Sequence, residues 1–539
     1  MEQIEVVMEK KMNSAKQSLI LALAATVAAL VGRAEGVTLQ VGTPFADGAV
    51  LQRGMKVPVW GKAVGGAAQK VKVEFAGQTK VADVCAGGAW KVELDPMEAS
   101  KEGRTMSVSE LNEDGASGAS LEIKDILVGE VWFASGQSNM ECPIWWNSTR
   151  YRDKRGGLIA TMTRLPNVRY VKCKCEWSVE PKELSAKWRK LTPEHLQQFN
   201  GGSGFWFSAV AFYYARELYL ALDIPIGIID ASWGGTNIDA WTPRCGYDNC
   251  DPSIKSIAEY PVKADRKPEE YKGRWPLNGP QQQPTVIYNG MVASFAPMAM
   301  RGVIWYQGCH NGGESKTYCA RLHALYEGWR REFANPDLKF YLVQLAPWKS
   351  SWLGICMAQT KFCAEEKNAA LAVTADVGNF DDVHPNDKEI VAQRLVVHAL
   401  KRDYGFEIPE EDSPVVKSVS FKDGKATVSF VHAKNWYVYT PDRQHNPAFE
   451  LAGEDGEWRP AVIVNFRKGT DKDGNPRDTD FIDGPELVLK SEQVPNPVRV
   501  RYMGQPRTSS IIYNEASLPL GPFEADAVSG QNREENHNK

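Results

Sequence analysis

Hydrophobic and polar positions define a central region of alternating strands and helices. The strand candidates are apolar runs of strand length, at 126–133, 167–172, 224–230, 300–306, 340–345 and 370–375. The helix candidates have helical spacing or lie between two strands, at 207–222, 318–333 and 388–402. Apolar strands that alternate with helices predict a parallel sheet covered by helices on both faces. In such sheets, ligands bind beyond the carboxyl ends of the strands.

The two flanking regions are patterned differently. Residues 37–125 contain short β-rich runs separated by Gly, Asp and Pro turns, which predict an antiparallel sandwich with a structural or carbohydrate-facing role. After a junction at Ile408-Pro409, short strands return over 410–526 and predict a second β-rich domain. The central domain therefore spans 126–409. Within it, the polar segment 251–283 is expected to be irregular, either lining the site or forming a surface excursion.

The two ends of the chain have distinct compositions. Lys10, Lys11 and Lys16 precede an apolar stretch over 19–31, and the small residues around Ala34 follow. This order predicts a signal peptide over 1–34 and export to the periplasm or the exterior. No later run reaches the 18 apolar residues of a membrane helix, so no membrane span is expected in the mature chain. The polar end, 527–539, is expected to be disordered.

Composition excludes one class of partner. The chain has 43% hydrophobic and 24% charged residues and a formal net charge of −4, as in a soluble globular protein. It has no basic stripe that could follow a phosphate backbone, so a nucleic-acid partner is not expected. Oligomeric state leaves no signal in the sequence.

Ten cysteines raise the question of disulfides or metal. Export makes disulfides possible, and Cys245 and Cys250 are the pair closest to a plausible small loop. Cys173 and Cys175 share one face of a strand, but no second Cys/His pair at zinc spacing follows them. Buried or bridged thiols are therefore expected, and no metal.

A candidate nucleophile follows the first central strand. The apolar run that begins at Val131 stops at Gly136, and Ser138 comes two residues later. A hydroxyl on a tight turn beyond a buried strand can attack a carbonyl while nearby N–H groups face the developing oxyanion. Short Gly/Ser/Asn clusters are more commonly plain turns, so the stretch needs a base from elsewhere in the chain.

A candidate base lies between the last central strand and the last helix. Asp381 and Asp382 precede His384 by three and two residues. Either carboxylate could reach back to the imidazole Nδ1 and leave Nε2 free to take a serine proton. An isolated loop of this kind is more commonly solvent-facing.

Several motifs in order then resemble one family. They are Val128-Gly-Glu-Val-Trp-Phe-Ala-Ser-Gly-Gln-Ser-Asn-Met140, Ser232-Trp-Gly-Gly-Thr236, Tyr288-Asn-Gly-Met291, Arg301-Gly-Val-Ile-Trp-Tyr-Gln-Gly308 and Val383-His-Pro385, with Val50-Leu-Gln-Arg53 and Glu450-Leu-Ala-Gly-Glu-Asp455 in the flanks. Together they resemble the sialate O-acetylesterases, a branch of the SGNH (GDSL-like) hydrolases. The resemblance covers nearly the whole mature chain. It implies an SGNH-type three-layer α/β/α domain with flanking β-rich domains.

The resemblance also implies roles. Ser138 would be the nucleophile and His384 the base, with Asp382 favoured over Asp381 as its partner because the family usually has its aspartate two residues before the histidine. The implied oxyanion donors are the Ser138 N–H, a Gly234 or Gly235 N–H, and a side-chain amide of Gln307 or Asn311. No cofactor or metal is implied. The family usually continues Trp-Tyr-Gln-Gly with Glu-Ser-Asn, whereas Cys309-His310-Asn311 stands here, which bears on substrate preference.

These observations favour an exported serine esterase that removes acetyl groups from sialic acids. An esterase for acetylated xylan or xyloglucan would use the same chemistry, and the resemblance does not separate the two. A catalytically silent glycan-binding protein is the alternative from another class, if the change at Cys309-His310 has disabled the site.

Overall fold

The structure is a computed structural model that describes most of the chain. The described residues are 38–65, 69–111, 117–144, 154–192, 207–263, 279–378, 381–439, 448–505 and 511–527. The signal peptide expected over 1–34 lies outside them, as does nearly all of the expected tail. The chain forms two compact units, the first taking its described residues from 38–42, 58–95 and 104–124, and the second from 43–57, 96–103 and 125 onward.

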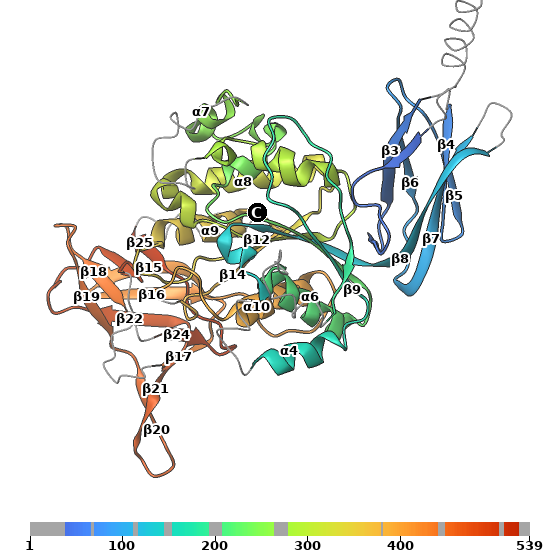
Figure 1. The fold of residues 1–539 in the computed structure, drawn as a ribbon. Helices are drawn as coiled ribbons and strands as arrows, with labels where there is room; N and C mark the ends of the chain where they lie inside the picture. The colour runs from blue at the N-terminus through green and yellow to red at the C-terminus, as the bar shows by residue number, and fades with distance from the viewer. Residues whose placement is uncertain are drawn as a thin grey trace, which may run out of the picture. The chain divides into compact units, whose positions relative to one another are not determined.

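The first unit consists of antiparallel strands (Figure 1). One sheet has the order β1 (Thr38–Val41), β3 (Val57–Val64) and β6 (Ala89–Leu94), and the other joins β5 (Gln78–Asp83), β4 (Lys70–Phe75) and β7 (Ser100–Leu111). Alternate residues of β4 and β6 are buried, among them Val71, Val73 and Trp90. This two-residue period is what the sequence predicts for a sandwich.

A mostly parallel sheet forms the centre of the second unit. Its order is β10 (Arg189–Lys190), β9 (Val168–Lys172), β11 (Ile226–Ser232), β8 (Ser117–Gly136), β12 (Gly302–Tyr306), β13 (Lys339–Val343) and β14 (Ala369–Ala372). Edge strand β10 is antiparallel to β9, and the pairs from β9 to β14 are parallel. Short β2 (Val50–Gln52) pairs in parallel with β8.

Helices cover both faces of this sheet. Figure 1 shows α8 (Ser315–Glu332) and α9 (Leu353–Glu365) on one side, and α6 (Ala209–Leu222) and α10 (Lys388–Arg402) on the other. Consecutive residues of β8 point to opposite layers, since Trp132 packs edge-on against Tyr214 of α6 and Phe133 against Trp329 of α8. This explains why the central strands carry apolar residues on both faces. Among the described residues, the remaining α-helices are α2 (Ser138–Glu141), α4 (Lys154–Met162) and α7 (Lys255–Ala258).

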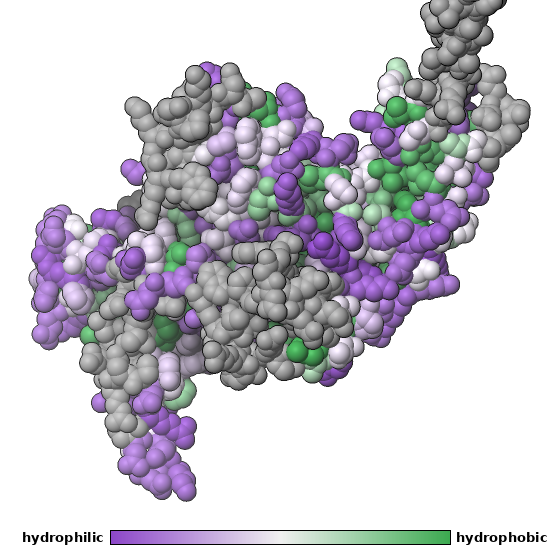
Figure 2. Space-filling view, in the orientation of Figure 1, coloured by the Kyte–Doolittle hydropathy of each residue, from purple (hydrophilic) through white to green (hydrophobic). Residues whose placement is uncertain are grey.

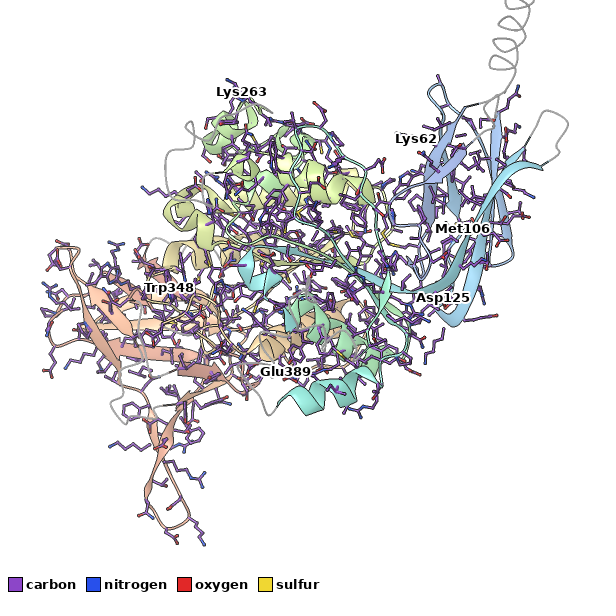
Figure 3. All side chains as sticks on the ribbon, in the orientation of Figure 1. Lys62, Met106, Asp125, Lys263, Trp348 and Glu389 are labelled. Carbon is purple, nitrogen blue, oxygen red and sulfur yellow. The ribbon has the colours of Figure 1, made fainter. Side chains whose placement is uncertain are left out.

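Three salt bridges hold α10 and the second half of β8 in place. Glu389, labelled in Figure 3, accepts a hydrogen bond from Arg216 of α6 at 2.7 Å, which ties α10 to its neighbour. Glu130 of β8 is fully buried between Arg53 at 2.6 Å and Arg301 at 3.0 Å. These guanidiniums outweigh the cost of burial and hold the pKa of Glu130 below its usual value. The Leu-Gln-Arg motif at 51–53 thus helps to hold the central strand in place, because Arg53 binds Glu130.

The rest of the second unit is antiparallel sheet. A seven-stranded sheet has the order β15 (Val415–Lys422), β16 (Lys425–Val431), β22 (Glu486–Lys490), β19 (Trp458–Ile463), β18 (Phe449–Ala452), β23 (Arg499–Tyr502) and β25 (Phe523–Asp526). A four-stranded sheet joins β20 (Arg467–Thr470), β21 (Pro476–Asp483), β17 (Asn435–Tyr439) and β24 (Ile511–Asn514). The β20–β21 hairpin is strongly hydrophilic in Figure 2. Within the described residues, no helix is long and apolar enough to cross a bilayer.

The predicted fold class, an α/β domain with a parallel sheet and flanking β-rich regions, is confirmed. Predicted and observed element bounds differ by at most three residues for β9, β11, β12, β13, β14, α6 and α8, and they agree for α10. The described parts of 251–283 contain α7 and two 3₁₀ turns, η3 (Pro252–Ile254) and η5 (Pro280–Gln282). Helix α9 was not predicted, because its apolar residues are not confined to one face.

Candidate active site

Three predicted residues meet at the carboxyl edge of the central sheet. The Ser138 hydroxyl lies 2.9 Å from Nε2 of His384, and Nδ1 of that ring lies 3.0 Å from Oδ1 of Asp382. The same carboxylate oxygen accepts the backbone N–H of His384 at 2.9 Å, which fixes the bend of the loop. An Nδ1 proton shared with a carboxylate leaves Nε2 as the acceptor for the serine proton. Asp382 therefore contacts the imidazole, while Asp381 is exposed.

The register of the sheet explains why these residues meet. Gly136, the last residue of β8, is paired with Ser232 at the end of β11 and with Tyr306 at the end of β12. The three strands therefore end at one level, and the residues that follow them share one edge. Gly136 has φ +136°, and a Cβ there would lie 2.3 Å from the Tyr306 carbonyl oxygen. Only glycine allows the chain to leave the sheet here and place Ser138 on its turn.

The glycine turn after β11 lies against the nucleophile. A Cβ on Gly234 would come within 3.1 Å of the Ser138 Cβ, so the two backbones are in close contact. The Gly234 N–H donates to Oε2 of Glu141 at 2.6 Å. This N–H, one of the predicted oxyanion donors, therefore already has an acceptor in the structure. Gly235 adopts φ +69°, and its carbonyl accepts from Gln282.

The two predicted side-chain amides are buried in a scaffold beneath this edge. Gln307 donates to the Thr236 carbonyl at 3.1 Å and to Oδ1 of Asn311 at 2.7 Å, and both amides are fully buried. The Asn311 amide donates in turn to Glu314 at 2.6 Å. Both amide hydrogens of Gln307 thus have protein acceptors, so Gln307 does not offer the substrate a donor here, whereas the bond of Asn311 to Glu314 uses one of its two amide hydrogens. Sequence spacing could not show that their donors are already engaged.

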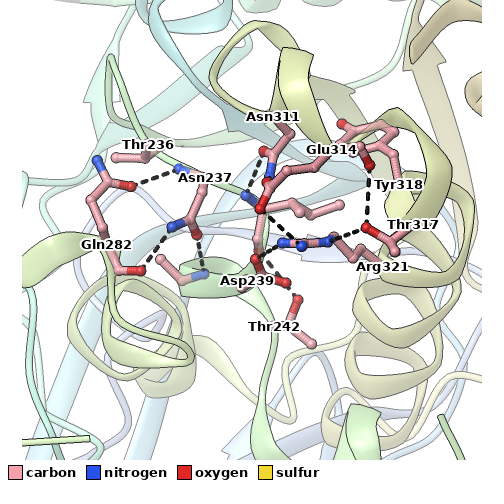
Figure 4. A network of polar contacts seen from close by, with 12 residues as sticks. Thr236, Asn237, Asp239, Thr242, Gln282, Asn311, Glu314, Thr317, Tyr318 and Arg321 are labelled. Atoms are coloured by element: carbon pink, nitrogen blue, oxygen red, sulfur yellow. Dashed lines mark hydrogen bonds and ion pairs between the residues drawn. The ribbon is translucent and has the colours of Figure 1, made fainter. Parts of the chain in front are cut away.

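A buried ion pair anchors this scaffold (Figure 4). Arg321 of α8 binds Asp239 and also donates to Glu314 at 3.0 Å. Burial raises the pKa of the Asp239 carboxyl to about 6, although the Arg321 guanidinium opposes that rise. The scaffold therefore holds the loop after β12 against the turn after β11.

Comparison with known proteins now identifies the family. The sequence profile of the family described as "Carbohydrate esterase, sialic acid-specific acetylesterase" matches residues 128–400, which is half of the chain. The chain belongs to this family. The matched range includes Ser138 and His384 and most of the central sheet.

Individual relatives agree with the family assignment. The chain is 26% identical to the sialate O-acetylesterase of Mus musculus over 82% of its length and 88% of that protein. It is 27% identical to the Homo sapiens sialate O-acetylesterase over 75% of its length and 78% of that protein. A crystal structure of a carbohydrate acetylesterase from Xanthomonas citri superimposes with a TM-score of 0.72 at 29% identity, covering 91% of this chain and all of that one. The predicted resemblance is confirmed, and the chain is a carboxylic-ester hydrolase.

Two residues of this carbohydrate esterase that the sequence analysis did not single out hold the histidine loop. The Asn139 amide, next to the candidate nucleophile, donates to the Val383 carbonyl at 3.1 Å. Lys388, buried at the start of α10, donates to Oδ1 of Asn139. The Ser138 turn and the His384 loop are therefore tied by their neighbours as well as by the triad itself. A lysine in the first turn of a helix gives no sequence signal for such a contact.

A buried polar network also lies behind the Ser138 turn. Lys172 donates to Asp230 at 3.1 Å and to Ser232 at 3.0 Å, at the ends of β9 and β11. The second oxygen of Asp230 accepts the Ser208 N–H at the start of α6. Glu141 completes the network, and burial raises the pKa of its carboxyl while the Lys172 ammonium opposes the rise.

A pH-dependent contribution to stability follows from this raised pKa. The folded protein binds the Glu141 proton more tightly than the unfolded chain does. Glu141 therefore contributes less to the stability of the folded state as pH rises from about 4.5, the ordinary glutamate pKa, through the raised pKa of the folded state. Glu141→Gln removes this titration and keeps an acceptor for Gly234. We therefore expect the stability of the wild type relative to Glu141→Gln to fall as pH increases across that window. Urea unfolding of both proteins at several pH values measures the difference, and a rise with pH would contradict this assignment.

The backbone of His310 lies beside the turn that carries Ser138. Its N–H donates to Oε1 of Gln137 at 3.3 Å, and the Gly308 N–H donates to the same oxygen at 3.1 Å. Gln137 directly precedes Ser138, so η8 (Cys309–Glu314) borders the candidate site. Burial lowers the pKa of the His310 imidazole, although Glu314 opposes this.

Cys245 and Cys250, the pair for which a disulfide was most plausible, are not bridged in the structure. All ten cysteines lie in the described residues, and all are free thiols. Cys245 points instead toward α8, where its thiol donates to Glu332 at 3.2 Å. Proximity in sequence favoured a bridge, but the 3₁₀ turn η2 (Arg244–Tyr247) directs this side chain to the helix.

Proposed function

We propose that this chain is an exported carbohydrate O-acetylesterase that cleaves acetyl esters of sialic acids through Ser138, His384 and Asp382. The observation that carries the proposal is the chain of contacts from Asp382 through both ring nitrogens of His384 to the Ser138 hydroxyl. This order of acid, imidazole and hydroxyl is the arrangement that activates a serine. Export rests on the composition of residues 1–34.

The proposed reaction has two halves. Nε2 of His384 takes the hydroxyl proton as Ser138 Oγ attacks the acetyl carbonyl, and the same proton then goes to the departing sugar oxygen. Water, deprotonated by His384, next attacks the acetyl-Ser138 ester and releases acetate. Asp382 holds the imidazole orientation and stabilises the positive charge that develops on the ring.

The oxyanion would be received by backbone donors. Gln307 and Asn311 are engaged in the buried scaffold, which favours the Ser138 N–H and a glycine N–H of the turn after β11. Gly235 is one candidate. Gly234 lies closer to Ser138 but would first have to exchange its Glu141 acceptor for the substrate oxygen.

Substrate class is tested by comparing rates. The mammalian relatives are named for sialate, which supports acetylated sialic acid, whereas the Xanthomonas citri relative is described only as a carbohydrate acetylesterase. Acetate release should be measured from an aryl acetate, from O-acetylated sialic acid and from acetylated xylan. Higher kcat/KM on sialic acid than on xylan supports the proposal, and the reverse ranking would move the substrate to plant polysaccharide. No release from any ester would favour a silent glycan-binding protein.

Replacing His310 with serine should change substrate ranking more than chemistry. The backbone of His310 borders the Ser138 turn, while the triad contacts are made by other residues. His310→Ser is expected to alter the ratio of sialic acid to xylan hydrolysis and to leave aryl acetate turnover within about tenfold, or ~1.4 kcal/mol. Equal losses on all three esters would instead place His310 in the catalytic machinery, and no change would make it structural.

Ester hydrolysis is expected to survive removal of metal ions. The proposed steps use a serine, an imidazole and N–H donors, and each proton has a named carrier among these groups. Turnover of an aryl acetate should therefore be unchanged after exhaustive treatment with EDTA. A loss of activity that a divalent ion restores would contradict this mechanism.

A further inference from the structure

Helices α8 and α9 bring together three different metal-binding side chains. Cys319 and His323 are four residues apart on α8, so they lie on one face of the helix. Glu365 is the last residue of α9, which packs against α8. Nε2 of His323 lies 2.9 Å from Oε2 of Glu365, and the Cys319 sulfur lies 3.6 Å from the same oxygen. One sulfur, one nitrogen and one oxygen donor therefore face a common point.

The spacing of these donors suits a tetrahedral ion. All three donor atoms lie within 4.8 Å of one another. Zinc binds sulfur at about 2.3 Å and nitrogen or oxygen at about 2.0–2.2 Å, which separates tetrahedral donors by roughly 3.3–3.8 Å. The distance from the Cys319 sulfur to Oε2 of Glu365, 3.6 Å, already lies in this range, and the 2.9 Å between Nε2 of His323 and the same oxygen is shorter than it. A set of thiolate, imidazole and carboxylate favours Zn²⁺ over Mg²⁺ or Ca²⁺, which prefer oxygen alone.

The orientation of the imidazole is already fixed. Nδ1 of His323 lies 2.9 Å from Oε1 of Glu366, directly after α9. The Phe362 ring packs edge-on against the imidazole at 5.0 Å. A carboxylate at Nδ1 keeps a proton on that nitrogen when Nε2 exchanges its contact with Glu365 for a metal ion, which is the arrangement found in metal-bound histidines. Glu366 thus supports His323 without being a ligand itself.

A fourth coordination position is accessible. The three side chains line a cavity of about 610 Å³ that is also bordered by Cys245 and Cys250. Solvent in this cavity can supply a water ligand, and an ion can enter from it. The cavity is separate in its residues from the Ser138, His384 and Asp382 triad.

We propose that Cys319, His323 and Glu365 form a Zn²⁺ site that ties α8 to α9. As the ion binds, the Cys319 thiol proton and the proton shared between Nε2 of His323 and Oε2 of Glu365 are both released to solvent, which leaves a thiolate, an imidazole nitrogen and a carboxylate as ligands. Binding to the folded state alone stabilises it, because the donors are dispersed along the unfolded chain. The site is structural and lies outside the proposed ester chemistry.

A second group, Glu410, Asp412 and His432, provides a matched control. Its donors also lie within 4.8 Å of one another. There, however, Arg402 binds Asp412 at 2.6 Å with two hydrogen bonds, so a cation already occupies that carboxylate. A His432→Asn variant therefore should not affect zinc binding at the proposed site.

Cobalt titration of the chelator-treated full chain tests the proposal. Co²⁺ should bind with one equivalent, give thiolate-to-cobalt absorption and be displaced by Zn²⁺. Cys319→Ser and His323→Asn should each raise the Kd for Zn²⁺ at least about tenfold and abolish or weaken that absorption, while His432→Asn leaves both unchanged. Absence of stoichiometric binding, or binding and absorption that persist in Cys319→Ser, would overturn the site.

If a variant does not fold, the protection of the Cys319 thiol by Zn²⁺ in the wild type still tests the proposal. Zn²⁺ should slow alkylation of Cys319, measured by peptide mass spectrometry, and leave alkylation of the exposed Cys85 unchanged. Equal rates for Cys319 with and without Zn²⁺ would contradict the proposal. Aryl acetate turnover measured on the same samples reports separately on the esterase, which is expected to act with the zinc site empty or filled.

Discussion

Ser138→Ala should fold normally and lose at least about 10³-fold of its esterase activity. The Ser138 hydroxyl stands 2.9 Å from Nε2 of His384 just beyond the end of β8, so its replacement removes the oxygen that forms the acetyl intermediate in the proposed mechanism. Binding and backbone N–H donors would remain, so a small residual rate above the uncatalysed reaction is expected. Steady-state hydrolysis of an aryl acetate measures the loss, with circular dichroism as the check on folding.

Ser135→Ala supplies a control on the same strand. Ser135 is fully buried within β8, three residues before the candidate nucleophile. Its replacement changes one hydroxyl in the same region and should leave turnover within a few-fold of the wild type. Wild-type turnover in Ser138→Ala would remove this residue from the mechanism.

Asp382→Asn should reduce turnover by about 10²-fold or more, and Asp381→Asn by less than about threefold. Oδ1 of Asp382 accepts from Nδ1 and from the backbone N–H of His384. An amide there can turn its NH₂ toward the ring, which favours the wrong tautomer and removes the charge that stabilises the imidazolium. The two substitutions are chemically identical and adjacent, so each serves as the control for the other.

The kcat values of the two variants on an aryl acetate decide the assignment. A small substrate keeps substrate recognition out of the comparison. A larger loss in Asp381→Asn would show that the carboxylate three residues before the histidine is the working partner. Equal small losses would show that neither carboxylate orients the base.

Most of the central sheet could be predicted because strands such as β11 and β12 are buried on both faces, whereas the exposed edge strand β10 was not predicted. The apolar runs that became β11 and β12 have no polar face, and the amphipathic runs around them became helices. Helix α9 was not predicted because its apolar residues lie on several faces. Long-range contacts, such as those of Glu130 with two arginines, could not be predicted. In the sequence, Glu130 is only a single charged residue within an apolar strand.

The candidate site, too, could be predicted only in part. Ser138 and His384 were visible because turn residues follow strands whose ends must share an edge. The engaged states of Gln307 and Asn311, and the contact of Glu141 with Gly234, depend on side-chain directions that spacing does not encode. Cys319, His323 and Glu365 were missed because their contacts join two helices across 42 residues of sequence.

Covalent labelling at Ser138 tests the central claim most directly. A small alkyl fluorophosphonate should inactivate the enzyme with one equivalent of label, and peptide mass spectrometry should place that label on Ser138. Labelling should be slowed in His384→Ala, because the imidazole no longer accepts the hydroxyl proton at 2.9 Å. Complete inactivation with the label on another residue, or labelling at Ser138 that leaves activity intact, would contradict a serine esterase centred on this residue.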